Sequence, residues 1–183
     1  MHPSSERILE HYTPERAAEY AARGWYTLAR LEARRLARKH GTTLRVAAGV
    51  IAAVSPMNVW SGNILAAERI LAAAARGDRR APRAGLSANV AKAWRIARAG
   101  ERPLDVLSGP KVRAFYRNIL GDLSAVTVDR WAARAAGVPD SYPGTAAGYA
   151  RCEEAYREAA LKVGLAPAIL QAVVWCNIRG KVT

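Results

Sequence analysis

The sequence predicts an all-α fold, a compact multi-helix domain, and three observations support this class. Alanine, leucine and arginine, which favour helices, dominate the 183 residues. Runs of β-branched residues are few and short, and the aromatic residues are scattered along the chain. Hydrophobic residues make up 51% of the chain, which is enough for one core at this length. We therefore expect residues 1–183 to form a single helical domain.

The first predicted helix is a long one. Thr13 is a suitable N-cap, Pro14 fits a first helical turn, and Gly41 can end the helix after His40. The next helix, residues 44–54, is apolar nearly all round, which predicts burial on most sides and a place at the core of the domain. The apolar face expected for the long helix comprises Ala17, Tyr20, Ala21, Leu28, Leu31 and Leu36.

The rest of the chain divides into shorter helices separated by proline and glycine. Pro56 disfavours a helix at the residue before it and so interrupts the chain after residue 54. A basic loop, residues 76–84, carries Gly77 and Pro82. The remaining predicted helices cover residues 59–75, 86–99, 103–107, 111–120, 129–136, 144–163 and 167–178, and residues 126–128 form a short apolar segment.

Positive charge is concentrated in the middle of the chain, whose net charge is +13. Residues 76–117 hold eleven Lys or Arg against three Asp or Glu, a net charge of +8 in 42 residues. The segments on either side contribute only +4 and +1. A field focused in this way is typical of a surface that follows phosphates, so DNA is the predicted partner. An arginine-rich composition set by a GC-rich genome is the alternative, and acidic protein or membrane partners are further ones.

The sequence carries no signal for export or for a membrane anchor. No apolar stretch approaches the roughly 20 residues of a membrane span, and the first ten residues lack the apolar centre of a signal peptide. Cys152 and Cys176 have no metal-ligand spacing, and we expect buried, reduced thiols. We expect a monomer without metal, cofactor or membrane partner, in the cytoplasm with the nucleoid, or in the host cytoplasm if the protein is viral.

Residues 103–120 have the layout of a helix-hairpin-helix. A short helix, a turn formed by Ser108, Gly109 and Pro110, and a second helix follow one another directly. Free N–H groups at such a turn, together with the positive end of the second helix, can bind a phosphate, and Gly109 lets the backbone approach it closely. An ordinary corner between two helices has the same pattern. The net charge of +8 around the turn favours the DNA-binding interpretation.

Four short segments carry a resemblance to a known family. Residues 107–114 read LSGPKVRA, and residues 126–129 read VTVD, with Asp129 18 residues after Lys111. Residues 48–63 read AGVIAAVSPMNVWSGN, and residues 170–175 read LQAVVW. The four segments resemble parts of the helix-hairpin-helix (HhH-GPD) DNA glycosylases. This is the superfamily of endonuclease III and 8-oxoguanine glycosylase. Residues 48–63 resemble the buried helix and the DNA-inserting loop, and residues 107–114 resemble the hairpin. Residues 126–129 resemble the catalytic segment, and residues 170–175 resemble the pocket-closing helix.

The sequence departs from the family pattern at three points. Gly109 and Pro110 stand where the family has Gly-Val-Gly, which shortens the hairpin. Met57 and Asn58 replace the usual glutamine of the inserting loop, and the cysteines of the endonuclease III cluster are absent. A diverged, phage-type member of the superfamily would suit this pattern.

The resemblance implies a lysine nucleophile and a catalytic aspartate. Lys111 would attack C1′ of a flipped nucleotide to form a Schiff base, and Asp129 would stabilise the positive charge that develops on the sugar. The position of Lys111 at a helix start favours the neutral amine that attack requires, because the helix dipole repels a cation there. The alternatives are that Lys111 only contacts phosphate and that Asp129 only caps the helix beginning at Arg130.

Further residues are candidates for DNA contact. Tryptophan can stack on an extruded base, although packing in the core is the alternative for each tryptophan. Asn58 and Gln171 can read a base edge or act as a wedge. The candidate DNA-binding residues are Ser108, Gly109, Pro110, Arg113, Arg117, Arg79 and Arg80. The candidate base-pocket or wedge residues are Ser55, Met57, Asn58, Trp60, Trp131, Gln171 and Trp175.

Three functions are consistent with these features. The first is a DNA glycosylase, with or without strand cleavage, that cuts the N-glycosidic bond of a damaged or modified base. The second is a phage enzyme that hypermodifies DNA bases on the same scaffold, similar to the α-glutamyl/putrescinyl thymine pyrophosphorylases. The third is a non-catalytic module that binds DNA through the hairpin and the basic segment.

Overall fold

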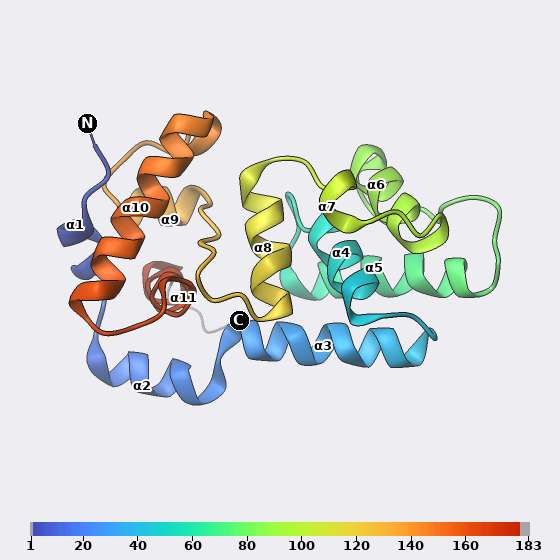
Figure 1. Cartoon of the computed structure of the whole chain (residues 1–183), viewed down its shortest axis with the longest axis horizontal. Helices are drawn as coiled ribbons and strands as arrows, with labels where there is room; N and C mark the ends of the chain where they lie inside the picture. Colours follow the sequence, from blue (N-terminus) through green and yellow to red (C-terminus); the bar gives the residue numbers. More distant parts are fainter. Residues whose placement is uncertain (1, 180–183) are drawn as a thin grey trace. The chain divides into compact units, whose positions relative to one another are not determined.

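The computed structural model describes residues 2–179, without the side chains of residues 19–23, and this part of the chain is all-helical (Figure 1). It contains eleven α-helices, one 3-10 helix and no β-strand between those residues. The predicted all-α class is therefore confirmed.

The helices group into two compact units. Unit 1 comprises residues 1–27 and 121–183, and unit 2 comprises residues 28–120. The chain thus enters unit 1, forms all of unit 2 and returns to complete unit 1. That residues 1–183 form a single domain stays a prediction.

Unit 2 is built around the apolar helix α4 (Leu44–Val54). Residues 47–54 are all buried, and α4 packs against α5, α6, α7 and α8. Gly49 allows α7 to approach α4 closely, since a Cβ atom there would lie 2.8 Å from Cγ of Pro103 in α7. The other helices of unit 2 are most of α3 (Trp25–Lys39), α5 (Trp60–Ala75), α6 (Ser87–Arg98), α7 (Pro103–Val106) and α8 (Pro110–Leu120).

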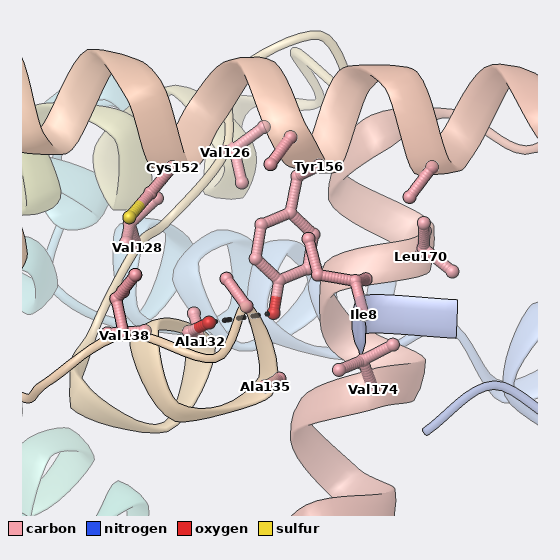
Figure 2. Close-up of a cluster of buried hydrophobic side chains, with 14 of the residues drawn as sticks. Ile8, Val126, Val128, Ala132, Ala135, Val138, Cys152, Tyr156, Leu170 and Val174 are labelled. Atoms are coloured by element: carbon pink, nitrogen blue, oxygen red, sulfur yellow. Dashed lines mark hydrogen bonds between the residues drawn. The ribbon is translucent and has the colours of Figure 1, made fainter. Parts of the chain in front are cut away.

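Unit 1 combines helices from both ends of the chain. They are α1 (Ser5–Leu9), α2 (Pro14–Arg23), the start of α3, α9 (Arg130–Ala135), the 3-10 helix η1 (Tyr142–Gly144), α10 (Ala146–Lys162) and α11 (Pro167–Arg179). The side chains of Ile8, Leu170 and Val174 meet around the fully buried Tyr156, whose hydroxyl donates to the carbonyl oxygen of Ala132 at 3.3 Å (Figure 2). This bond ties α10 to α9.

A second tyrosine of α10 fixes the extended segment before α9. The Tyr149 hydroxyl donates to the carbonyl oxygen of Val126 at 2.7 Å and accepts from the N–H of Val128 at 3.1 Å. Both valines are buried, so the short apolar segment expected at residues 126–128 is part of the core. Because the segment is held by its backbone, Asp129 begins α9 at a defined place.

The expectation of one long helix from Pro14 to His40 is wrong. The chain leaves the helical conformation at Gly24 (φ 6°, ψ 101°), and α2 and α3 are separate helices. After this break, α3 buries its small residues and Leu36, whereas Leu28 and Leu31 are 54% and 50% exposed. Ala17 and Leu36 are buried as predicted, and the side chains of Tyr20 and Ala21 lie outside the described residues.

Other predicted elements agree with the structure to within a few residues. The turn at Pro56, the loop after α5 and the two helices around the Ser108–Pro110 turn are all present. The helix expected from Gly144 begins instead at Ala146, because the Thr145 hydroxyl caps it by accepting from the N–H of Gly148. No single helix in residues 2–179 is long and apolar enough to cross a membrane; α10 and α11 meet that criterion only as a pair bent by 98°.

Candidate nucleic-acid interface

The turn between α7 and α8 is exposed and open. Gly109 has a φ of 81°, in the left-handed region that favours glycine, and a Cβ atom built on it would meet nothing within 4 Å. Ser108, Gly109 and Pro110 are all exposed. Pro110 begins α8 without an N–H group, and the next two N–H groups have no acceptor within the helix because of their position in its first turn. This backbone can therefore donate hydrogen bonds to an anion.

Arg113 supports the turn between α7 and α8. Its Nε donates to the carbonyl oxygen of Leu107 at 2.9 Å, and a terminal guanidinium nitrogen donates to the carbonyl oxygen of Leu104 at 3.0 Å. Carbonyl groups at the end of a helix lack helical donors, so Arg113 satisfies groups that α7 leaves unpaired. The structure thus gives Arg113 a supporting contact in the hairpin, and its direct contact with DNA stays a prediction.

Lys92 is a residue of the turn that the sequence analysis missed. Its Nζ, from α6, donates to the Ser108 hydroxyl at 2.5 Å. The contact places a second cation at the hairpin turn, in addition to Lys111. Lys92 belongs to the basic segment of residues 76–117, but its position in the sequence did not indicate that α6 would place it next to Ser108.

Lys111 is partly exposed and makes no hydrogen bond or ion pair with any other residue in the described part of unit 2. It is the second residue of α8, directly after the turn. Arg79 and Arg80 are exposed in the loop between α5 and α6, and Arg117 is exposed on α8. These side chains provide positive charge in unit 2.

The loop after α4 carries the candidate wedge residues. Met57 is 92% exposed and has a φ of 61°, which is uncommon for a residue other than glycine. Asn58 is also exposed, and its Oδ1 lies 2.6 Å from where a Cβ atom of Gly62 would be. The Ser55 hydroxyl donates to the carbonyl oxygen of Ala52 at 2.9 Å, so it caps its own helix. Trp60, which begins α5, is partly buried.

Asp129 lies in unit 1, where its carboxylate is held at the start of α9. Oδ1 accepts from the N–H groups of Trp131 and Ala132, both at 2.9 Å, and Oδ2 accepts from Nε1 of Trp175 at 3.0 Å. The capping role expected for Asp129 is confirmed by the first two bonds. The side chain remains partly exposed, and Oδ2, which accepts one hydrogen bond, has a lone pair left to accept another.

Arginine side chains stack on two tryptophans beside Asp129. The guanidinium carbon of Arg134 lies 4.6 Å from the ring centroid of Trp131, and that of Arg179 lies 4.3 Å from the ring centroid of Trp175. Arg134 also pairs with Asp140 through two bonds of 2.6 Å, and this contact lowers the pKa of Asp140. Partly exposed indoles next to cations form the kind of surface that binds nucleic-acid bases and phosphates.

Gln171 lies in the interior of unit 1. It is buried, and its Oε1 accepts from the Tyr26 hydroxyl at 2.7 Å. Burial raises the pKa of Tyr26 above its ordinary value. A cavity of about 10 Å³ nearby, lined in part by Trp25, has room for about one water molecule and not for a base. Base reading by Gln171 stays a prediction, and its observed contact is a structural one.

The structure places the candidate residues in two groups. The hairpin, Lys111, the arginines of the basic segment and the loop at Met57 belong to unit 2, whereas Asp129, Trp131, Gln171 and Trp175 belong to unit 1. Both cysteines are buried and unpaired, as predicted. Among the described residues, no group of three or more His, Cys, Asp or Glu is placed to hold a metal ion.

Comparison with known proteins shows that a family model matches residues 2–182 of the chain. The chain belongs to DUF7178. This is a family of unknown function. No curated protein and no solved structure matches the chain.

Proposed function

We propose that this DUF7178 member is a DNA glycosylase that acts on the N-glycosidic bond of a flipped, damaged or modified base. The observation that carries the proposal is the open α7–α8 turn followed at once by Lys111, a lysine that makes no polar contact with the described residues around it. The turn offers backbone donors to a DNA phosphate, and Lys111 lies one residue into the helix that begins there. A phosphate contact at the turn would thus bring DNA to this amine.

The proposed chemistry is nucleophilic substitution at the sugar. The neutral amine of Lys111 attacks C1′, the bond from C1′ to the base nitrogen breaks, and the base leaves with the electron pair and takes up a proton. The new nitrogen gives up one proton; its lone pair then forms the C=N bond as the C1′–O4′ bond breaks, and O4′ takes up a proton, which gives the protonated Schiff base. Water then releases the enzyme, or loss of a C2′ proton first expels the 3′ phosphate.

Asp129 is the proposed stabiliser of the positive charge on the sugar. Two backbone N–H groups and the indole of Trp175 hold its carboxylate in one orientation, and a fixed charge needs no reorganisation during the reaction. The partly exposed Trp131 and Trp175 beside it are the proposed stacking partners for the extruded base.

Borohydride trapping tests the role of Lys111. We expect wild-type protein to form a covalent complex with a duplex that contains the correct modified base, because borohydride reduces the Schiff base to a stable amine. The Lys111→Arg variant should bind the same duplex through its retained charge and form no trapped complex. Wild-type protein that binds a broad panel of modified duplexes without trapping on any, or a Lys111→Arg variant that traps like wild type, would overturn the role.

A non-catalytic DNA-binding module is the second candidate. It is favoured by the structural use of Asp129, whose two carboxylate oxygens already bond to protein donors. This candidate predicts steeply salt-dependent DNA binding that persists in both Lys111→Gln and Asp129→Asn, with no base loss from any substrate. The glycosylase proposal predicts binding in both variants and base loss only in wild type.

A further inference from the structure

We propose that unit 2 contains a second phosphate-binding site, at the start of α4. A cavity of about 510 Å³ lies there, lined by Arg30, Thr43, Leu44, Arg45 and Leu120. All five residues belong to unit 2. The site would hold the phosphate of a nucleotide, and it does not depend on Lys111 being a nucleophile.

Arg30 has a buried donor that lacks an acceptor in the described part of the chain. Its Nε is buried and has no hydrogen-bond partner among the described residues. A guanidinium N–H that is removed from water without an acceptor is unfavourable, and an arginine binds a phosphate well because its donors match the oxygen geometry. Arg30 as a whole is only partly buried and lines the cavity, so an anion there can bond to its guanidinium, and a rotation of the side chain toward that anion would give Nε an acceptor.

Among the described residues, Arg45 adds an unpaired positive charge at the start of α4. It is exposed in the first turn of α4, has no ion pair within residues 2–179, and no acidic residue shares that turn. A cation at the N-terminus of a helix is repelled by the helix dipole, whereas an anion is attracted. Positive charge therefore accumulates at the start of α4 without compensation from the described part of the chain, as expected where a ligand brings the negative charge.

The backbone of α4 and the cavity walls complete the site. The Thr43 hydroxyl accepts from the N–H of Val46 at 3.2 Å, which leaves the N–H groups of Leu44 and Arg45 without a helical acceptor. Leu44 and Leu120 provide apolar walls against which a sugar can pack. The five lining residues include no Asp or Glu. A volume of this size suits a nucleotide better than an isolated inorganic ion.

This site is separate from the hairpin. Leu120 is the last residue of α8, and the hairpin turn precedes its first residue, Pro110. Ten helical steps correspond to about 15 Å along the helix axis. Two phosphates bound at the two ends of α8 would therefore be different phosphates.

Titration of the ¹⁵N-labelled full chain with thymidine 5′-monophosphate, followed by NMR, tests the site. We expect the amide signals of Leu44 and Arg45 to shift with the nucleotide and not with unphosphorylated thymidine. Arg45→Gln should weaken binding at least about tenfold, as should Arg30→Lys, which keeps the charge but loses the planar donor set. The matched controls, Arg34→Gln and Arg38→Gln, remove exposed arginines from α3 and should bind like wild type.

The source of the phosphate is distinguished with a single-stranded oligonucleotide. If the site takes a DNA backbone phosphate, Arg45→Gln lowers the slope of log affinity against log salt by about one, and Arg34→Gln does not. If the site takes a free nucleotide, Arg45→Gln leaves that slope unchanged but weakens the binding of thymidine 5′-monophosphate. The proposal is overturned if the monophosphate does not shift these amides, or if the control variants lose binding as strongly as Arg45→Gln.

Discussion

Asp129 accepts three hydrogen bonds, which makes it both a structural residue and the proposed electrostatic catalyst. The two roles can be separated because asparagine is also a good N-cap. An asparagine side chain has one oxygen, so it can cap α9 but cannot also accept from the indole N–H of Trp175 while doing so.

Substitution of Asp129 should therefore affect stability and activity differently. We expect Asp129→Asn to lower the free energy of unfolding by about 1 kcal/mol and Asp129→Ala by about 2 kcal/mol, because alanine also loses the cap. Base release should fall at least about 100-fold in Asp129→Asn. Urea denaturation and single-turnover assays measure the two effects, and an Asp129→Asn variant of wild-type activity would remove Asp129 from the proposed chemistry.

The two cysteines give a prediction about pH. Burial raises the pKa of Cys152 and of Cys176 to about 11, above the ordinary thiol value of 9.0. In the unfolded chain these thiols lose their protons first, so their contribution to stability is present below pH 9 and is lost as the pH rises toward 11.

We expect the free energy of unfolding to decrease over that interval, and a thiol reagent at pH 8 to label neither cysteine in the folded protein. The double variant Cys152→Ala/Cys176→Ala is the control for the pH effect, since the buried tyrosines would remain to titrate. Rapid labelling of either thiol in folded protein would contradict their burial.

At the residue scale, the sequence predicted types of contact better than partners. Asp129 as an N-cap follows from its place before a helix, whereas its bond to Trp175 joins residues 46 apart in the chain. Arg113 was predicted to bind DNA because of its charge, but its donors point at carbonyl groups of α7. Long side chains find partners that depend on tertiary packing, and spacing alone does not contain that information.

At the element scale, the α7–α8 hairpin can be tested with a matched pair of glycines. Gly109 and Gly100 both lie in unit 2 with φ values of 81° and 70°, and a Cβ atom at either would meet nothing within 4 Å. Gly109→Ala and Gly100→Ala should therefore each lower the free energy of unfolding by a similar amount, about 1 kcal/mol, because of backbone strain alone.

Only the Gly109→Ala variant should lose DNA affinity, because the added methyl group lies where the backbone would approach a phosphate. Fluorescence anisotropy with a labelled duplex, beside thermal denaturation, measures both quantities. Equal DNA affinity in Gly109→Ala and Gly100→Ala would show that the turn does not bind DNA.

The elements themselves could largely be predicted from glycine, proline and apolar periodicity. The buried helix α4 was clear because nearly every position is apolar. The break at Gly24 was missed because the flanking sequence has helical periodicity on both sides, and a glycine inside such a pattern is often tolerated. Because the break at Gly24 lets α3 turn a different face toward the core than a continuous helix would, Ala29 and Ala33 are buried and Leu28 and Leu31 are exposed.

At the scale of the whole molecule, the arrangement of the chain bears on cooperativity. Unit 1 is formed by segments that precede and follow unit 2, and α3 runs without a break across the boundary between residues 27 and 28. Helix formation is cooperative along the chain, so α3 links the folding of the two units.

We therefore expect a single unfolding transition, which is what one domain, as predicted from the sequence, would show. Calorimetry should give a calorimetric enthalpy equal to the van't Hoff enthalpy. Two resolved transitions would show that the units are independent domains. Neither composition nor periodicity could have predicted the division at residues 27 and 120, because it depends on contacts between the two ends of the chain.

Base release from DNA is the proposed activity, and mass spectrometry of DNA incubated with the protein tests it most directly. We expect a free modified base in the small-molecule fraction and an abasic or cleaved product in the DNA, with both absent for Lys111→Arg and at least about 100-fold lower for Asp129→Asn. A nucleoside of altered mass that stays in the DNA would indicate base hypermodification instead. Unchanged DNA across a broad panel of modified bases, from protein shown to be folded and bound, would contradict the glycosylase proposal.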